Sequence, residues 1–243
     1  IRICLVGSEM CIRDRHKIPN IFPEDVLLQS KKASFLQNKK WDDYSHVPFV
    51  TIDPKDARDH DDACYAKPDD DPKNIGGHLI WVAIADVAHF VRSGDAIDNE
   101  ARHRGNSTYF PDRVVPMLPD NLSGNLCSLH EGEKRACIVV KIKIDSVGNK
   151  ISHKFTRAVI QSWASLEYGE VQEVIDKGKG KPKVLDLVNT VIKPLYDAYS
   201  CLKISRKARS PLDLNLPERK IEIDEKGIVC LLYTSPSPRD RYG

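Results

Sequence analysis

Apolar residues along the chain gather in short runs that polar turns separate, and their spacing follows two different periods. Several runs are rich in β-branched residues and predict strands. They cover residues 47–52, 63–66, 78–91, 137–144, 150–162 and 212–224. The longest, HLIWVAIADVAHFV over 78–91, predicts a strand buried on both faces. The turn at 146–149 predicts a hairpin between its two flanking strands.

Other segments repeat apolar positions at the helical period. They predict helices over residues 24–38, 165–176 and 184–207. Pro23 marks the start of the first, Ser165 is the expected N-cap of the second, and Pro194 predicts a kink or restart in the third. Residues 94–104 predict a short polar helix that follows a turn. Residues 104–119 contain three prolines and predict an ordered loop with extended stretches. The mixture predicts an α+β fold.

We interpret the two ends of the chain as different in origin from the middle. Residues 5–14 can be encoded by DNA whose opposite strand encodes residues 230–240, as expected for one sequencing adapter read at both ends. We therefore expect residues 1–15 and 229–243 to be non-native. The net charge of the whole chain is +2, and each end carries +1, so the part between them is near neutral. Bulk charge therefore gives no evidence for nucleic-acid binding.

Cysteine spacing and hydropathy limit the class further. Of seven cysteines, four lie outside the suspect ends: Cys64, Cys127, Cys137 and Cys201. They form no C-x-x-C pair or zinc spacing, which indicates reduced thiols of a cytoplasmic protein. No run is long enough to span a membrane, and we expect a monomer without membrane contact.

Five aspartates crowd the segment VTIDPKDARDHDDA over residues 50–63, between two predicted strands. Carboxylates held together repel one another and raise their pKa unless a cation compensates them. Oxygen ligands of this kind suggest Mg²⁺, and two such ions can promote phosphodiester hydrolysis. The alternative is a solvated acidic loop, which is our interpretation of residues 69–71. An EF-hand fits poorly, because Cys64 would stand where glycine is needed.

Three further residues suggest either structure or chemistry. Asp86 and His89 interrupt an apolar run, and a hydrogen-bonded place in the core is as good an explanation as a catalytic one. Tyr109 lies next to Phe110 and near arginines, so it could stack on a base. By itself this pattern favours a ring that fills the core.

Four motifs together resemble the catalytic domain of the ribonuclease II/ribonuclease R family, most closely its bacterial ribonuclease R members. They are PFVTIDPKDARDHDDA, IWVAIADVAHFV, RGNSTYFPDRVVPMLPDNLSGNLCSL and PLDLNLPERKIEIDE. They stand in the family's order and cover residues 16–228. The resemblance implies a lead-in segment over 16–49, followed over 50–228 by the N-terminal part of an RNB-type catalytic domain. That domain is expected to be a truncated, β-barrel-like mixed sheet surrounded by helices.

The resemblance also implies an activity and its residues. The activity is Mg²⁺-dependent 3′→5′ hydrolysis of single-stranded RNA to 5′-nucleoside monophosphates. The family's D-x5-D-x-D-D motif falls on Asp53, Asp59, Asp61 and Asp62, which are implied to hold metal and position water. Asp61 is the residue most directly tied to chemistry, and Asp56 lies outside the motif. The family's tyrosine falls on Tyr109, which favours base stacking over core filling.

Two departures from the family qualify this expectation. The second half of the catalytic domain is missing, including an arginine and a glutamate near the scissile phosphate, and so are the flanking OB-fold domains. We therefore expect a fragment that is inactive alone. The alternatives are a non-catalytic RNA-binding module and a different metal phosphohydrolase. The second rests on the His60–Asp61 pair, which lacks a partner His and Asp on helices.

Overall fold

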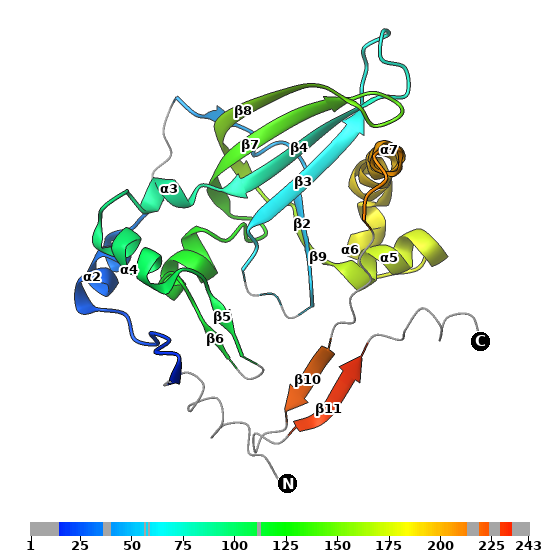
Figure 1. Ribbon diagram of the computed structural model, residues 1–243. Coiled ribbons are helices and arrows are strands. Elements are labelled where there is room, and N and C mark those ends of the chain that lie inside the picture. Colours follow the sequence, from blue (N-terminus) through cyan, green and yellow to red (C-terminus); the bar gives the residue numbers. More distant parts are fainter. Residues whose placement is uncertain are drawn as a thin grey trace. The chain divides into compact units, whose positions relative to one another are not determined.

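The computed structural model describes residues 15–35, 40–55, 57, 59–110 and 113–212, together with the backbone of two strands at 219–223 and 229–234. The chain divides into two compact units (Figure 1). The first contains residues 1–29, 93–119 and 212–243, and the second contains residues 30–92 and 120–211.

The second unit is built on a seven-stranded mixed sheet in the order β1-β8-β7-β4-β3-β2-β9. The strands are β1 (Asp42–Asp43), β2 (Val50–Asp53), β3 (Asp62–Pro68), β4 (His78–Ala85), β7 (Lys134–Ile144), β8 (Lys150–Gln161) and β9 (Ala164–Glu167). The β1–β8 and β2–β9 pairs are parallel, and the others are antiparallel. Within the described residues this sheet is open, ending at β1 and β9, so the α+β class is confirmed with the barrel unclosed.

The strand predicted over residues 78–91 is too long. Strand β4 ends at Ala85, and a helical turn, α3 (Val87–Phe90), follows directly. Asp86 between them has φ −80° and ψ 75°, which leaves the extended region. Burial on both faces also fails near this end, because Ile84 is 46% exposed. The apolar run therefore joins a strand to a helix, a distinction that hydrophobicity alone does not make.

Helices cover one end of the sheet. They are α5 (Tyr168–Lys177), α6 (Pro182–Asp186), the π-helical turn η2 (Val188–Ile192) and α7 (Lys193–Ala208). The restart predicted at Pro194 is confirmed, because η2 precedes it and proline is tolerated in the first turn of α7. The N-cap prediction was wrong: Ser165 lies in β9, paired with Thr51, and Glu167 precedes the helix.

Two apolar clusters fix these helices to the sheet. In the larger, Val50 and Leu166 from adjacent parallel strands pack against Val171, Val174 and the η2 residues. In the smaller, Ala198 of α7 packs against Ala66 and Ile80. The β7–β8 turn also meets α7, since a Cβ added at Gly148 would lie 2.1 Å from the carbonyl oxygen of Cys201. Only glycine fits there, and the φ of +83° at this position also favours glycine.

The first unit contains α4 (Ala96–Arg104), the short hairpin of β5 (Thr108–Tyr109) and β6 (Val114–Val115), and the hairpin of β10 (Arg219–Ile223) and β11 (Val229–Thr234). Helix α2 (Glu24–Lys32) begins in this unit. The helix predicted over 24–38 thus ends early, with residues 36–39 outside the described part. Asp95 caps α4 by accepting from the Asp98 amide, as its sequence position favours.

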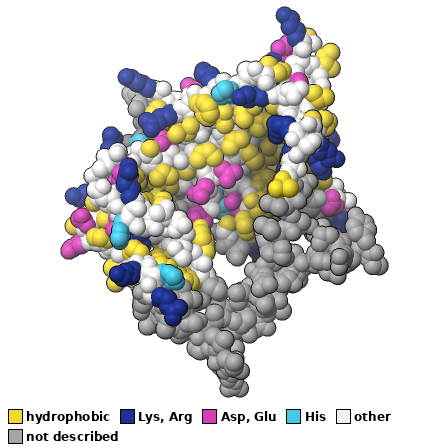
Figure 2. Space-filling view, viewed as in Figure 1, with side chains coloured by type: hydrophobic (Ala, Val, Ile, Leu, Met, Phe, Trp, Pro, Cys, Tyr) yellow, Lys and Arg dark blue, Asp and Glu magenta, His cyan; other side chains and the backbone are white. Residues whose placement is uncertain are grey.

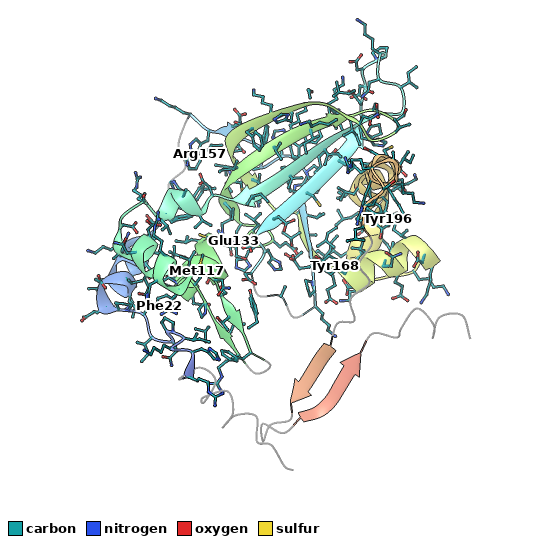
Figure 3. The ribbon with its side chains drawn as sticks, viewed as in Figure 1. Phe22, Met117, Glu133, Arg157, Tyr168 and Tyr196 are labelled. Atoms are coloured by element: carbon teal, nitrogen blue, oxygen red, sulfur yellow. The ribbon has the colours of Figure 1, made fainter. Side chains whose placement is uncertain are left out.

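Arg104 organises the described part of this unit. Its guanidinium donates to the carbonyl oxygens of Pro19, Ile21 and Pro116 over 2.9–3.1 Å. It also pairs with Glu100 at 2.8 Å and lies 3.7 Å from the ring centroid of Phe22, which Figure 3 labels. One side chain thereby ties together three segments that are distant in sequence. Among the described residues, the helices lack the length and apolarity that crossing a bilayer requires.

Candidate active site

The four aspartates of the motif lie where β2 and β3 meet their connecting loop. Asp53 is the last residue of β2, and Asp62 is the first residue of β3. Asp59 and Asp61 belong to the loop between these antiparallel strands. Asp53 and Asp59 are largely shielded from solvent, whereas Asp61 and Asp62 are exposed. The fifth aspartate, Asp56, is outside the described residues.

Backbone hydrogen bonds hold the end of this loop against the sheet. The amide of His60 donates to the hydroxyl of Ser128 at 2.9 Å, and the amide of Leu129 donates to the carbonyl oxygen of His60 at 2.8 Å. The amide of Ala85 donates to the carbonyl oxygen of Asp61 at 3.0 Å. The Asp59–Asp62 segment is therefore fixed by two other parts of the chain.

The carboxylates are close enough to affect one another's protonation. Desolvation by the surrounding atoms raises the pKa of Asp61, although its side chain reaches the surface, and the negative charges of Asp59, Asp62 and Asp53 raise it further. Desolvation and the charge of Asp53 raise the pKa of Asp62. Burial, followed by the charges of Asp62 and Asp53, raises the pKa of the neighbouring Cys64 thiol to about 12.

His60 is part of this arrangement, although sequence reasoning considered it only as a different kind of metal ligand. Its Nδ1 lies 2.7 Å from Oδ2 of Asp53, with both side chains mostly buried. Its ring also meets His130 edge to face, with centroids 5.9 Å apart. The placement of His60 inside the aspartate motif was the available signal. The position of His60 directly before Asp61 did not indicate that its ring would contact Asp53.

The donor set suits a hard divalent cation by its chemistry, because it consists of carboxylate oxygens whose mutual repulsion a cation would relieve. The described side chains do not form a ready-made cage. Among them, no group of three or more His, Cys, Asp or Glu is spaced to hold a metal ion. One reason is that the carboxylate of Asp53 contacts the ring of His60.

Tyr109 lies on the β5–β6 hairpin of the first unit, whereas the four aspartates belong to the second. It is paired with Val114 in the backbone register, and its side chain is 69% exposed. An exposed ring does not fill the core. Its role as a base-stacking residue stays a prediction.

Asp86 is buried, which fits the interpretation as a core residue, but within the described part of the chain its carboxylate lacks the hydrogen bonds which that interpretation includes. It is 1% exposed, and neither carboxylate oxygen accepts a hydrogen bond of good geometry from the described residues. Its compensation is an ion pair with Arg157, whose Nε lies 3.1 Å from Oδ2. Sequence reasoning missed Arg157, because this contact joins residues 71 positions apart.

Comparison with known proteins identifies the family to which this chain belongs. A model of the RNB domain matches residues 41–240, so the chain belongs to the RNB domain family. Ribonuclease R of Escherichia coli K12 is 39% identical over 198 residues, covering 80% of this chain and 24% of the relative. Ribonuclease R of Vibrio cholerae is 36% identical over 219 residues, covering 88% and 26%. The chain thus spans about a quarter of these relatives.

Solved structures agree with this assignment. RNase R of Mycoplasma genitalium in complex with ribose-methylated single-stranded RNA superposes with a TM-score of 0.86 at 28% identity, covering 98% of this chain and 37% of that one. The same enzyme in complex with double-stranded RNA also gives a TM-score of 0.86, at 29% identity. Fold and sequence therefore identify the same family.

Proposed function

We propose that this chain carries the acidic part of a 3′→5′ exoribonuclease site that hydrolyses single-stranded RNA to 5′-nucleoside monophosphates. The observation that supports this most directly is the electrostatic one: the charges of Asp53, Asp59 and Asp62 all raise the pKa of Asp61. Membership of the RNB domain family and likeness to ribonuclease R relatives supply the reaction class. Because the chain spans a quarter of those relatives, the whole activity is a proposal.

In this proposal Asp53, Asp59, Asp61 and Asp62 hold Mg²⁺, which when bound activates water and stabilises charge on the leaving 3′ oxygen. The chain's own residues have distinct tasks. Asp61 orients the attacking water by accepting a hydrogen bond from it. His60 holds one oxygen of Asp53 and leaves the other for a cation. Tyr109 stacks on a base near the RNA 3′ end.

A second candidate is an RNA-binding module without catalysis, and one observation favours it. The Asp53–His60 contact occupies one of the oxygens that a metal would need. In this reading the aspartates serve the fold, and RNA binds without any dependence on divalent ions.

Metal titration separates the two candidates. Calorimetry with Mg²⁺ or Mn²⁺ should show binding to the wild-type chain, and at least a tenfold weaker affinity for Asp61→Asn, because one charged ligand is lost. Asp70→Asn is the matched control, since Asp70 is exposed and its carboxylate pairs with Lys67, away from the motif. Equal affinity in all three proteins would contradict the metal site and leave the binding module.

Incubation with labelled RNA and Mg²⁺ tests the activity of this chain. Because it spans only part of its relatives, we propose that it does not degrade RNA processively by itself. Release of mononucleotides by the chain, abolished by Asp61→Asn, would show that the described residues already form a complete site.

A further inference from the structure

One face of the sheet carries a row of four side chains that crosses four adjacent strands. The register pairs Asp62 with Ile84, Ile84 with Ile138, and Ile138 with Arg157. Residues directly opposite in antiparallel strands project from the same face. Three strand spacings of about 4.8 Å place the backbone of Arg157 about 14 Å from that of Asp62. The row therefore runs from the aspartate cluster to an arginine.

This row is open to solvent, whereas a neighbouring part of the same face is closed. Ile84 and Ile138 are 46% and 39% exposed, and Phe155 in the next row is 64% exposed. One row further, Ala66 and Ile80 are buried beneath Ala198 of α7. Figure 2 shows the result as a broad apolar area over the sheet, with acidic side chains gathered beside it.

Arg157 is held in place by the buried carboxylate of Asp86. The ion pair uses Nε, and the arginine side chain keeps 52% of its surface exposed, so other N–H groups of the guanidinium remain available. Figure 3 labels Arg157 at the end of the sheet where β4 leads into α3, the position of Asp86. A fixed, half-exposed guanidinium is pre-organised for a phosphate group.

We propose that Arg157 binds a backbone phosphate of single-stranded RNA and that Asp86 is its positioning residue. The proposal rests on the proposed function, since it extends the path of the substrate away from the aspartates. Without a bound metal ion, the aspartates of the cluster repel phosphates. The guanidinium of Arg157 at the other end of the row attracts them. The apolar side chains between them contact ribose and bases, which carry no charge. The ligand of Arg157 is therefore a phosphodiester group of a nucleic-acid strand.

The competing explanation is that Arg157 only neutralises Asp86. Anisotropy of a fluorescein-labelled single-stranded RNA, measured over a salt series with EDTA present, distinguishes the two without requiring metal or catalysis. Arg157→Gln should weaken binding several-fold and reduce the slope of log K against log salt by about 0.7, the value for one phosphate contact on a single strand. Arg157→Lys should keep most of the slope, because the charge remains.

Two further variants complete the experiment. Lys154→Gln is the matched control: it removes one charge from the same strand, but Lys154 is paired with Lys141 and projects from the opposite face. The double variant Asp86→Asn with Arg157→Gln removes both charges, so it leaves no unpaired buried carboxylate to destabilise the fold. It should nevertheless show the same weakened binding and reduced slope as Arg157→Gln.

The outcomes are distinct. Wild-type affinity and slope in both Arg157→Gln and the double variant would overturn the proposal, as would the absence of RNA binding by the wild-type chain. A lower melting temperature in Arg157→Gln with unchanged RNA binding would assign Arg157 a structural role only. If the wild-type chain self-associates in sedimentation and Arg157→Gln does not, again with unchanged RNA binding, this face would be assigned to a protein contact. Failure of the proposed function would appear separately, as unchanged metal affinity in Asp61→Asn.

Discussion

At the scale of single residues, the chain uses buried charge in two different ways. Arg104 satisfies its guanidinium with three carbonyl oxygens and a carboxylate, and its side chain is only 2% exposed. Asp86 is equally buried, but within the described part of the chain its carboxylate has one ion-pair partner, the partly exposed Arg157. The contacts of Arg104 stabilise the fold, whereas the contact of Asp86 keeps the guanidinium of Arg157 at the surface.

Arg104→Lys should therefore destabilise the first unit strongly. Lysine keeps the charge but lacks the planar fork, so buried carbonyl oxygens lose their donors, at a cost of about 2–4 kcal/mol. Urea unfolding measures the change. Arg102→Lys, in the same helix with a 69% exposed side chain paired to Asp98, should change stability by less than about 0.5 kcal/mol. Equal effects would contradict the role given to Arg104.

Stability at low pH should depend on Lys143. Its hydrogen bond, followed by that of Asn74, lowers the pKa of Asp69 to about 2. The unfolded value is about 4, so the stabilisation is complete above pH 4 and is lost as the pH falls toward 2. Lys143→Met should flatten this part of the stability profile, measured by urea unfolding across a pH series. An unchanged profile would show that the pair contributes nothing.

At the scale of elements, the sequence was sufficient wherever one period dominated. The β7–β8 hairpin lies where its apolar alternation and turn residues place it, and helix α4 lies within the polar segment predicted to be helical. Errors arose where neighbouring elements share apolar residues. Ala85 to Phe90 continue one hydrophobic run across a strand and a helical turn, and Ser165 was assigned to a cap because its parallel partner Thr51 is remote in sequence.

Two glycines with positive φ should respond differently to substitution. Gly178 caps α5 with nothing within 4 Å of an added Cβ, so Gly178→Ala should cost about 1 kcal/mol from backbone strain alone. Gly148→Ala adds a clash with the backbone of α7 and should cost clearly more. Thermal unfolding of both variants compares them. Similar costs would show that α7 moves aside easily.

At the scale of the whole molecule, the family and the mixed sheet followed from motif order, and the comparisons confirm both. The site could be predicted only in part. Motif spacing placed Asp53, Asp59, Asp61 and Asp62 in the β2–β3 connection and at the strand ends that flank it. The contact of His60 with Asp53 and that of Asp86 with Arg157 depend instead on tertiary packing. A single sequence contains no local signal for such contacts.

The origin of the ends is also a question about the whole chain. The proposal that residues 1–15 and 229–243 derive from an adapter predicts that the source DNA carries unrelated coding sequence at both junctions. Sequencing the genomic locus tests this, with the segment encoding residues 41–212 as an internal reference. Native codons continuing through both ends would contradict the proposal.

The close approach of Gly148 to Cys201 has a practical consequence for anyone labelling this protein. A hairpin tip is normally a permissive place for an epitope or a fluorophore-bearing loop. Here the tip abuts the backbone of a helix whose other side chains close the sheet, so an insertion between Ser146 and Lys150 would displace that helix. The polar turn at Gly178 and Lys179 is the better point of attachment, because both residues are exposed and an added Cβ at Gly178 would meet nothing within 4 Å. Gly180 is less suitable, because an added Cβ there would lie 2.3 Å from the side chain of Val174.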